Sequence, residues 1–139
     1  MERAFSFPSN GIGYFIGHQI LNSEEIAILS PWISDIKVKY PYNNRGYDSE
    51  SLSAAIRNRG GVKLIVGEKE HNDYFLSRVP DDSYRIMEDL HAKAIVCTNL
   101  ALIGSANVTM GGLHHNIEIS KIVENNHDSI DDFIDKELN

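Results

Sequence analysis

Short apolar runs bounded by turn-forming residues recur along this chain, and this pattern predicts β-strands. Several runs are nearly continuous in aliphatic or β-branched residues, which is typical of strands that are covered on both faces. Two of the runs meet across Thr98 and Asn99, where we expect a tight hairpin. The six predicted strands span residues 26–33, 62–67, 83–87, 92–98, 100–105 and 116–123.

Three other segments carry apolar residues at helical spacing and are predicted to be helices. The first has Asp48 and Ser49 as candidate N-caps and ends before Gly60 and Gly61, which favour helix termination. The predicted helices span residues 49–59, 70–79 and 127–138. Strands and helices alternate first and a run of strands follows, so the sequence predicts an α/β fold with a mixed β-sheet flanked by helices.

The composition is that of an ordinary soluble globular protein, with 42% apolar and 24% charged residues among 139. No repeat or linker is visible, so we expect one domain from residue 1 to residue 139. Cys97 is the single cysteine, which excludes an internal disulfide. The apolar stretch at 11–17 is too short to span a bilayer, and the N-terminus lacks a signal-peptide pattern. We therefore expect a cytoplasmic protein without stable membrane association.

The net charge of −7 is unevenly distributed along the chain. Residues 123–139 carry six acidic side chains against one basic side chain, whereas residues 36–63 carry six basic against two acidic ones. The basic segment could meet a polyanion while the acidic end faces away from it. Mixed charges on a solvated surface explain the same pattern, and charge alone favours that simpler interpretation.

A histidine and a lysine stand at the start of the strand predicted at 92–98. Because side chains alternate along a strand, His91, Lys93, Ile95 and Cys97 are predicted to share one face. Burying the lysine there without a partner would be costly, and no carboxylate lies in phase on the same strand. An anionic ligand would remove that cost.

Further polar groups follow the next two predicted strands. The small residues of segment 104–107 let the backbone approach a ligand closely, and Ser105 and Asn107 can donate hydrogen bonds to an oxyanion. Asn116 and Glu118 alternate on the last strand, so both can face the same pocket. A carboxylate that is hydrogen-bonded to an imidazole fixes its tautomer and raises its basicity. Each of these residues alone is weak evidence, but together they predict an active site.

In this order and spacing, the residues resemble the HKD motif of the phospholipase D superfamily, which reads His-x-Lys, four residues, Asp, and after a short gap Gly-Ser. The matching groups are His91-x-Lys93, Gly104-Ser105-x-Asn107 and Asn116-x-Glu118. Upstream, Ser30-Pro31-Trp32 resembles the Ser-Pro-Tyr segment that is common in that family. The motif's Asp falls on Thr98, a position regarded in the family as supporting rather than reacting. A degenerate member that only binds its ligand therefore stays an alternative.

The resemblance implies a metal-independent, two-step phosphodiester transfer that needs no cofactor. Carried onto this sequence, His91 would attack phosphorus and form a phosphohistidine, and Glu118 would orient a histidine. The residues that would hold the phosphate oxygens are Lys93, Ser105 and Asn107, with Asn116 supporting the pocket. A zinc site formed by Cys97, His114 and His115 matches no standard ligand spacing.

The family's chemistry needs two such motifs, because a second histidine protonates the leaving group and later activates water. The sequence contains one motif, and the histidines at positions 18, 71, 114 and 115 lack a lysine two residues further on. The second histidine is therefore expected from another copy of the chain, across a two-fold axis. The resemblance to small one-motif members thus implies a phospholipase D-like half that dimerises.

The leading hypothesis is a homodimeric nuclease that cleaves DNA, and RNA stays open as a second substrate. Nucleic acid is preferred to lipid because of the one-motif form, the basic segment at 36–63, and the lack of a membrane-binding amphipathic helix. A phospholipid phosphodiesterase or phosphatidyl transferase is the alternative enzyme. A catalytically inactive nucleic-acid-binding module is the alternative from another class. Trp32 is interpreted as a packing residue, with a position at the rim of the site left open.

Overall fold

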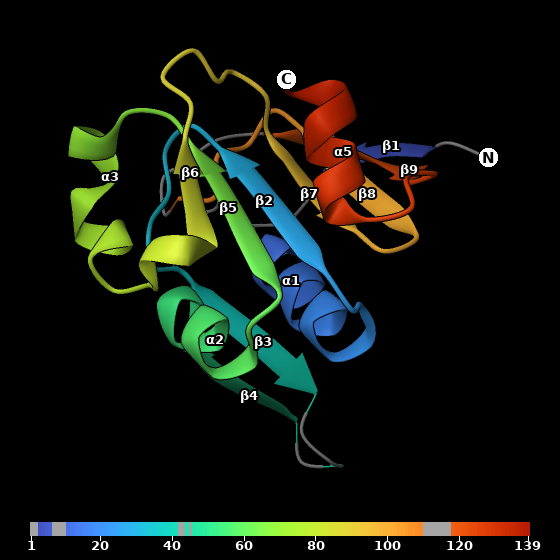
Figure 1. Cartoon of the computed structure of the whole chain (residues 1–139). Coiled ribbons are helices and arrows are strands. Elements are labelled where there is room, and N and C mark those ends of the chain that lie inside the picture. The colour runs from blue at the N-terminus through green and yellow to red at the C-terminus, as the bar shows by residue number, and fades with distance from the viewer. Residues whose placement is uncertain (1–2, 7–10, 42–43, 45, 110–117) are drawn as a thin grey trace.

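A mixed β-sheet forms the middle layer of this protein (Figure 1). The computed structural model describes residues 3–6, 11–41, 44, 46–109 and 118–139. Within these residues the strands of the sheet are β1 (Arg3–Ser6), β2 (Ile26–Ser30), β5 (Val62–Val66), β6 (Tyr84–Ile86), β7 (Ala94–Cys97), β8 (Leu100–Gly104) and β9 (Ile119–Glu124). Their order across the sheet is β1-β9-β8-β7-β2-β5-β6. The pairs β2–β5 and β5–β6 are parallel and the others antiparallel, which confirms the predicted mixed sheet.

All six predicted strands are present within the described residues, with slightly different bounds. β2 shows why its run could be recognised, because all five of its residues are buried. Ile26 and Ile28 join the apolar cluster on one face of the sheet, whereas Ala27 and Leu29 join the cluster on the other. A strand covered on both faces has no position left for a polar residue at the surface.

Helices cover both faces of the sheet (Figure 1). They are α1 (Gly11–Asn22), α2 (Leu52–Arg59), α3 (Lys69–Leu76) and α5 (Ile130–Glu137), with a 3₁₀ turn at Asp81–Ser83. Ile16 of α1, Ile56 of α2 and Phe75 of α3 belong to the larger core cluster, on one face. Ile130 and Ile134 of α5 pack on the opposite face, in the smaller cluster. The predicted helices at 70–79 and 127–138 are therefore confirmed as α3 and α5: α3 begins one residue earlier and ends at Leu76, and α5 is shorter at both ends.

Helix α1 was not predicted, because its glycines argue against a helix when the sequence is considered alone. These glycines are explained by β3 (Lys37–Pro41), which crosses α1 closely. A Cβ atom at Gly13 would lie 2.5 Å from the Lys37 carbonyl oxygen, and one at Gly17 would overlap the Lys39 carbonyl. Close approach to another backbone thus decides these two positions, at the expense of helix propensity.

The helix predicted at 49–59 begins too early, because Tyr47–Ser51 forms strand β4, paired with β3 in a separate two-stranded sheet. Helix α2 starts at Leu52, and its N-cap is Ser51, whose hydroxyl oxygen accepts a hydrogen bond from the Ala54 N–H. The predicted caps at positions 48 and 49 are therefore wrong, since both lie within β4. The predicted end before Gly60 is confirmed.

Part of the positive charge at 36–63 serves the fold. Arg57 donates a hydrogen bond to the Arg78 carbonyl, and Arg59 donates to the carbonyls of Ile20 and Glu24. These guanidinium groups tie α2 to the ends of neighbouring elements. The described basic residues of the segment are therefore divided between structural bonds and surface lysines. Among the described residues, no helix is both long and apolar enough to cross a bilayer.

Candidate active site

One edge of the sheet brings together most of the residues that the sequence singles out. β7 runs antiparallel to its neighbours β2 and β8, and β9 runs antiparallel to β8, so the end of β2, the start of β7, the end of β8 and the start of β9 meet there. The pairing of Leu29 with Ala94, Ala94 with Ile103 and Gly104 with Ser120 fixes this register. Residues distant in sequence thus become neighbours.

His91 and Lys93 lie in the segment before β7 rather than within it, because the strand begins at Ala94. The prediction that both alternate along the strand with Ile95 and Cys97 is therefore wrong. His91 is exposed, whereas Lys93 is half-buried and its ammonium group donates a hydrogen bond to the His91 carbonyl, at 3.1 Å. The Lys93 carbonyl accepts from the Gly104 N–H, which holds this segment against the end of β8.

Ser105 and Glu118 form a pair across β8 and β9. The Ser105 hydroxyl donates a short hydrogen bond to the Glu118 carboxylate and accepts one from the Ile119 N–H, at 3.1 Å. In this single chain, the described partner of Glu118 is therefore a serine and not a histidine. Only glycine fits at the adjoining Gly104, where a Cβ atom would lie 2.7 Å from the Ile119 carbonyl oxygen. The close approach of the two strands makes the Ser105–Glu118 bond possible.

Asn107 connects the site to the segment that follows β2. Its side-chain oxygen accepts from the Trp32 backbone N–H at 3.3 Å and lies 3.5 Å from the Ser30 hydroxyl oxygen. Ser30 is fully buried, and its hydroxyl oxygen also accepts from the Val108 N–H at 2.9 Å. The Ser30 hydroxyl proton goes to the Trp32 carbonyl, at 2.5 Å, so the Trp32 N–H is the main donor to the Asn107 oxygen. The Asn107 amide N–H₂ has no partner among the described residues. That group is a hydrogen-bond donor available to an anion.

Comparison with solved structures shows the same arrangement of elements elsewhere. Nuc from Salmonella typhimurium, described as a phospholipase D family member, is 17% identical, with a TM-score of 0.59 over 90% of this chain and 83% of its own. NucT from Helicobacter pylori is 14% identical, with a TM-score of 0.54 over 88% of this chain and 84% of its own. The chain has a phospholipase D-like fold.

The phospholipase D-like fold is also found within a longer chain. Polyphosphate kinase from Porphyromonas gingivalis is 14% identical, with a TM-score of 0.58 over 90% of this chain but 23% of its own. No protein-family model matches the sequence, and no curated protein matches it. The likeness is therefore one of fold, at sequence identities too low for the neighbours to assign residues to roles.

Thr98 lies at the far end of β7 from His91, in the turn of the hairpin that the sequence predicts. Its hydroxyl group is 2.9 Å from the Ser23 hydroxyl and accepts from the Glu24 N–H at 3.2 Å. It therefore joins the hairpin to the turn between α1 and β2. The presence of Thr98 in place of the motif Asp therefore affects this turn. The described polar residues of the candidate site lie at the opposite end of β7 and do not contact Thr98.

Three of the residues that the sequence singles out, Asn116, His114 and His115, fall outside the described residues. Cys97 is buried within the core, and burial raises the pKa of its thiol to about 12, which disfavours the thiolate that a metal would need. Among the residues that the structure describes, no group of three His, Cys, Asp or Glu side chains is arranged to hold a metal ion.

Trp32 was interpreted as a packing residue, but half of its surface is exposed and its ring stacks on His71 of α3. The loop that carries it is held by Asn72, which is buried and bonds to the Ile33 N–H and the Pro31 carbonyl. The sequence shows His71 and Asn72 side by side on a predicted helix, but their roles depend on contacts with the loop at Trp32, which the sequence does not reveal. The structure thus adds Trp32 and His71 to the rim of the site.

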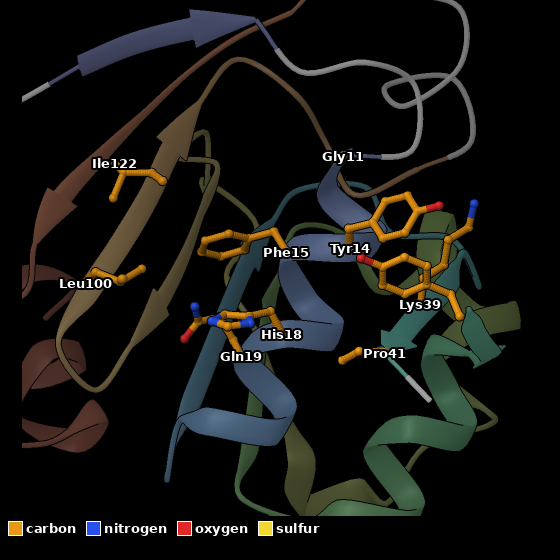
Figure 2. Close-up of a pocket in the computed structure, with 10 residues that line it drawn as sticks. Gly11, Tyr14, Phe15, His18, Gln19, Lys39, Pro41, Leu100 and Ile122 are labelled. Carbon is orange, nitrogen blue, oxygen red and sulfur yellow. The ribbon is translucent and has the colours of Figure 1, made fainter. Parts of the chain in front are cut away.

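A separate cavity of about 590 Å³ lies between α1, the β3–β4 hairpin and the ends of β8 and β9 (Figure 2). Phe15 and His18 of α1 point toward Leu100, and Tyr14 and Lys39 lie on the opposite side of the helix (Figure 2). None of the predicted catalytic or phosphate-binding residues that the structure describes lines it. Its walls are mainly apolar, unlike the polar edge at His91.

Proposed function

We propose that this protein is a metal-independent phosphodiesterase, a homodimeric nuclease that cleaves DNA through a phosphohistidine intermediate. The observation that carries the proposal is the single sheet edge at which Lys93, Ser105, Asn107 and Glu118 meet the segment of His91. These residues follow the order of the HKD motif on a phospholipase D-like fold. Each is weak evidence alone, and the shared edge supplies the convergence that a catalytic site requires.

In the proposed mechanism, an imidazole nitrogen of His91 attacks phosphorus and the bond from phosphorus to the leaving oxygen breaks. A second histidine gives its proton to that oxygen. The same histidine then takes a proton from water, whose oxygen attacks phosphorus and releases His91. The Lys93 ammonium and the Asn107 amide N–H₂ stabilise the charge on the non-bridging oxygens. The exposure of His91 fits a nucleophile that must reach a phosphate in a polymer.

Ser105 and Glu118 fit this scheme by exchanging partners. The Ser105 hydroxyl has one proton, and in the free chain it donates this proton in a hydrogen bond to the Glu118 carboxylate. When a phosphate and a histidine arrive, we expect that proton to turn to a phosphate oxygen. The carboxylate then accepts the histidine N–H in its place, which fixes the tautomer of the imidazole. The carboxylate thus keeps a donor in both states.

A second copy of the chain is proposed as the source of the second histidine. Beside the site, Ile103 of β8 and Ile119 of β9 are 40% and 61% exposed. The strand register puts them diagonally across the same face, next to Ser105 and Glu118. Adjacent exposed isoleucines at the rim of a polar site support an interface there, because burying them in a dimer would stabilise it.

A nuclease assay in excess EDTA tests the proposal. Wild-type protein should degrade an oligonucleotide or plasmid, and His91→Ala should abolish the cleavage. His18→Ala, at an exposed histidine outside the motif, is the matched control and should keep it. Cleavage that depends on a divalent metal, or that survives His91→Ala, would contradict the mechanism. Headgroup release from phospholipid vesicles, with no nucleic acid cleaved, would instead support the lipid alternative.

Mixing experiments test the shared site. If one active site needs His91 from both chains, a wild-type chain paired with His91→Ala is inactive. At equal amounts and random exchange, about a quarter of dimers keep both histidines, so activity should fall to roughly half of the value for unmixed proteins. Ile119→Asp should yield a folded monomer in sedimentation, with cleavage lost. Activity unaffected by mixing, or an active monomer, would refute the dimer.

A further inference from the structure

Two aromatic rings form an exposed stack at the rim of the candidate site. The Trp32 indole lies on the His71 imidazole with ring centroids 4.2 Å apart and an interplanar angle of 11°. Half of the Trp32 surface remains exposed, and 43% of the His71 side chain is exposed. A flat stack of this kind, open to solvent, is a surface on which another planar ring can be added. No packing role requires a tryptophan to be left so exposed.

The stack is fixed at both ends. The Trp32 backbone N–H donates to Asn107, and Asn72 of α3 holds the flanking Pro31 carbonyl and Ile33 N–H. His71 lies next to Asn72 on the same helix and contacts the Glu68 carboxylate, at 3.5 Å. The loop and the helix that carry the two rings are therefore held in place before any ligand arrives. Preorganisation of this kind lowers the entropic cost of binding.

The position of Trp32 relates the stack to the proposed chemistry. Asn107, to which its N–H is bonded, is one of the proposed phosphate donors. A nucleotide whose phosphate meets Asn107 carries its base within reach of the neighbouring indole. A lipid phosphodiester has no planar ring at that position, whereas every nucleobase presents a π-face.

The same face of α3 continues the aromatic surface. Tyr74 follows His71 by three residues, so the two are neighbours on the helix, and Tyr74 is 69% exposed. The Arg78 guanidinium lies over the Tyr74 ring, 4.4 Å from its centroid. Aromatic rings with an interleaved arginine are the pattern of single-strand binding surfaces.

The charges on α3 indicate which part of a nucleic acid binds here. Beside the aromatic residues, the three carboxylates of Glu68, Glu70 and Asp73 outnumber the cations of Lys69 and Arg78 and would repel a phosphate. The groups that we propose to hold the phosphate lie instead at the sheet edge, at Lys93 and Asn107. The arrangement thus separates a phosphate-binding edge from a base-binding rim.

We propose that Trp32 and His71 form a stacking platform for an unpaired nucleobase next to the scissile phosphate, so that this protein prefers single-stranded nucleic acid. The inference rests on the proposed nuclease function and deepens it, by assigning the substrate form and the residues that select it. A base inside a duplex is already stacked and cannot lie on the platform without being unpaired first. Discrimination therefore comes from access to the base face rather than from its hydrogen-bonding edge.

Trp32 is the single tryptophan of the chain, so intrinsic fluorescence reports on the platform directly. In His91→Ala, which prevents cleavage, a single-stranded oligonucleotide should quench this fluorescence. An abasic oligonucleotide of equal length should bind without quenching, and a duplex should quench less. Equal quenching by the abasic and base-bearing strands, or none by either, would overturn the platform. DNA and RNA strands should behave alike, because stacking needs only the base.

Cleavage kinetics give a second readout. Trp32→Ala should raise KM for a single-stranded oligonucleotide by about 5- to 150-fold, the range measured for loss of one base stack, with a smaller effect on kcat. Trp32→Phe should restore most of the affinity. Tyr47→Ala, at an exposed aromatic on the β3–β4 hairpin, is the matched control and should change KM less than twofold. A Trp32→Ala enzyme with unchanged KM would refute the proposal.

The abasic oligonucleotide separates this inference from the proposed function. Wild-type protein should still cleave it in EDTA, more slowly than the base-bearing strand, and Trp32→Ala should cleave it as well as wild type does. If neither strand is cleaved, the nuclease proposal fails. If both are cleaved with equal KM, the nuclease proposal stands and the platform alone is refuted. Thermal unfolding of each variant confirms that it is folded, as expected for a half-exposed side chain.

Discussion

Asn72 offers the sharpest test of how the rim of the site is held. Its side chain is 1% exposed and makes three hydrogen bonds within the chain. The side-chain oxygen accepts from the Ile33 N–H at 2.9 Å, and the amide nitrogen donates to the carbonyls of Pro31 and Glu68 at 3.0 and 2.8 Å. Asn72→Ala removes all three without removing the loop.

The expected loss of stability in Asn72→Ala can be estimated from what happens to each of the groups that Asn72 binds. The Pro31 carbonyl keeps a bond from the Gly67 N–H, so it stays satisfied. The buried Ile33 N–H loses its described acceptor, and an unsatisfied buried donor costs about 1–3 kcal/mol. With the small cavity added, we expect a loss of about 2–4 kcal/mol. For a chain of 139 residues this corresponds to a melting temperature lower by roughly 7–14 °C.

Urea and thermal unfolding of the wild-type protein and of Asn72→Ala measure this difference in stability. Asn58→Ala is the matched control, because Asn58 is an exposed helical asparagine bonded to the Glu50 carboxylate, and its replacement should change stability by less than about 0.5 kcal/mol. The Trp32 emission should also shift, since its loop loses the anchor. If Asn72→Ala unfolds within about 0.5 kcal/mol of wild type, the assignment of Asn72 as the anchor of this loop is wrong.

Three further outcomes are expected. Thr98→Ala should lower stability by about 1 kcal/mol while leaving kcat unchanged, because it removes a hydroxyl that accepts one backbone bond far from His91; a large fall in kcat would contradict this. Gly104→Ala should reduce both stability and cleavage, since its Cβ atom would press on the Ile119 carbonyl; unchanged melting would exclude that contact. Cys97 should resist thiol reagents at pH 8 in the native protein and react after unfolding, because burial raises its pKa from 9.0 to about 12. The folded state favours the neutral thiol, so its contribution to stability is complete below pH 9 and is lost as the pH rises toward 12; fast native labelling at pH 8 would contradict burial.

The sequence predicted the sheet well because burial on both faces leaves a continuous apolar run, as in β2. It failed where a polar or glycine-rich segment is fixed by tertiary contacts. Strand β4 reads as polar because its first three residues are exposed on a two-stranded hairpin and the other two are only half-buried. Helix α1 carries Gly13 and Gly17 only because β3 crosses it. Such contacts between distant segments leave no local periodicity to read.

For the candidate site, the order of residues was readable but their partners were not. Alternation from Ala94 backwards suggested a strand through His91, yet the ladder with β2 stops at Ala94. The bond from Ser105 to Glu118 depends on the register of β8 with β9, which spacing alone does not give. For Trp32 the sequence favoured packing and left the rim of the site open, and the stack on His71 of α3 was visible only in the structure.

The position of Thr98 has a consequence for how such chains diverge. The residues of the motif lie at the two ends of β7, and the four residues of this strand separate the ends by about 13 Å. At one end, the Thr98 hydroxyl joins the hairpin to the turn between α1 and β2. At the other end, His91 and Lys93 face the reacting phosphate in our proposal. Selection can therefore act on the two ends independently. We therefore expect that a small side chain able to accept the Glu24 N–H can replace Thr98 without changing the chemistry at the other end.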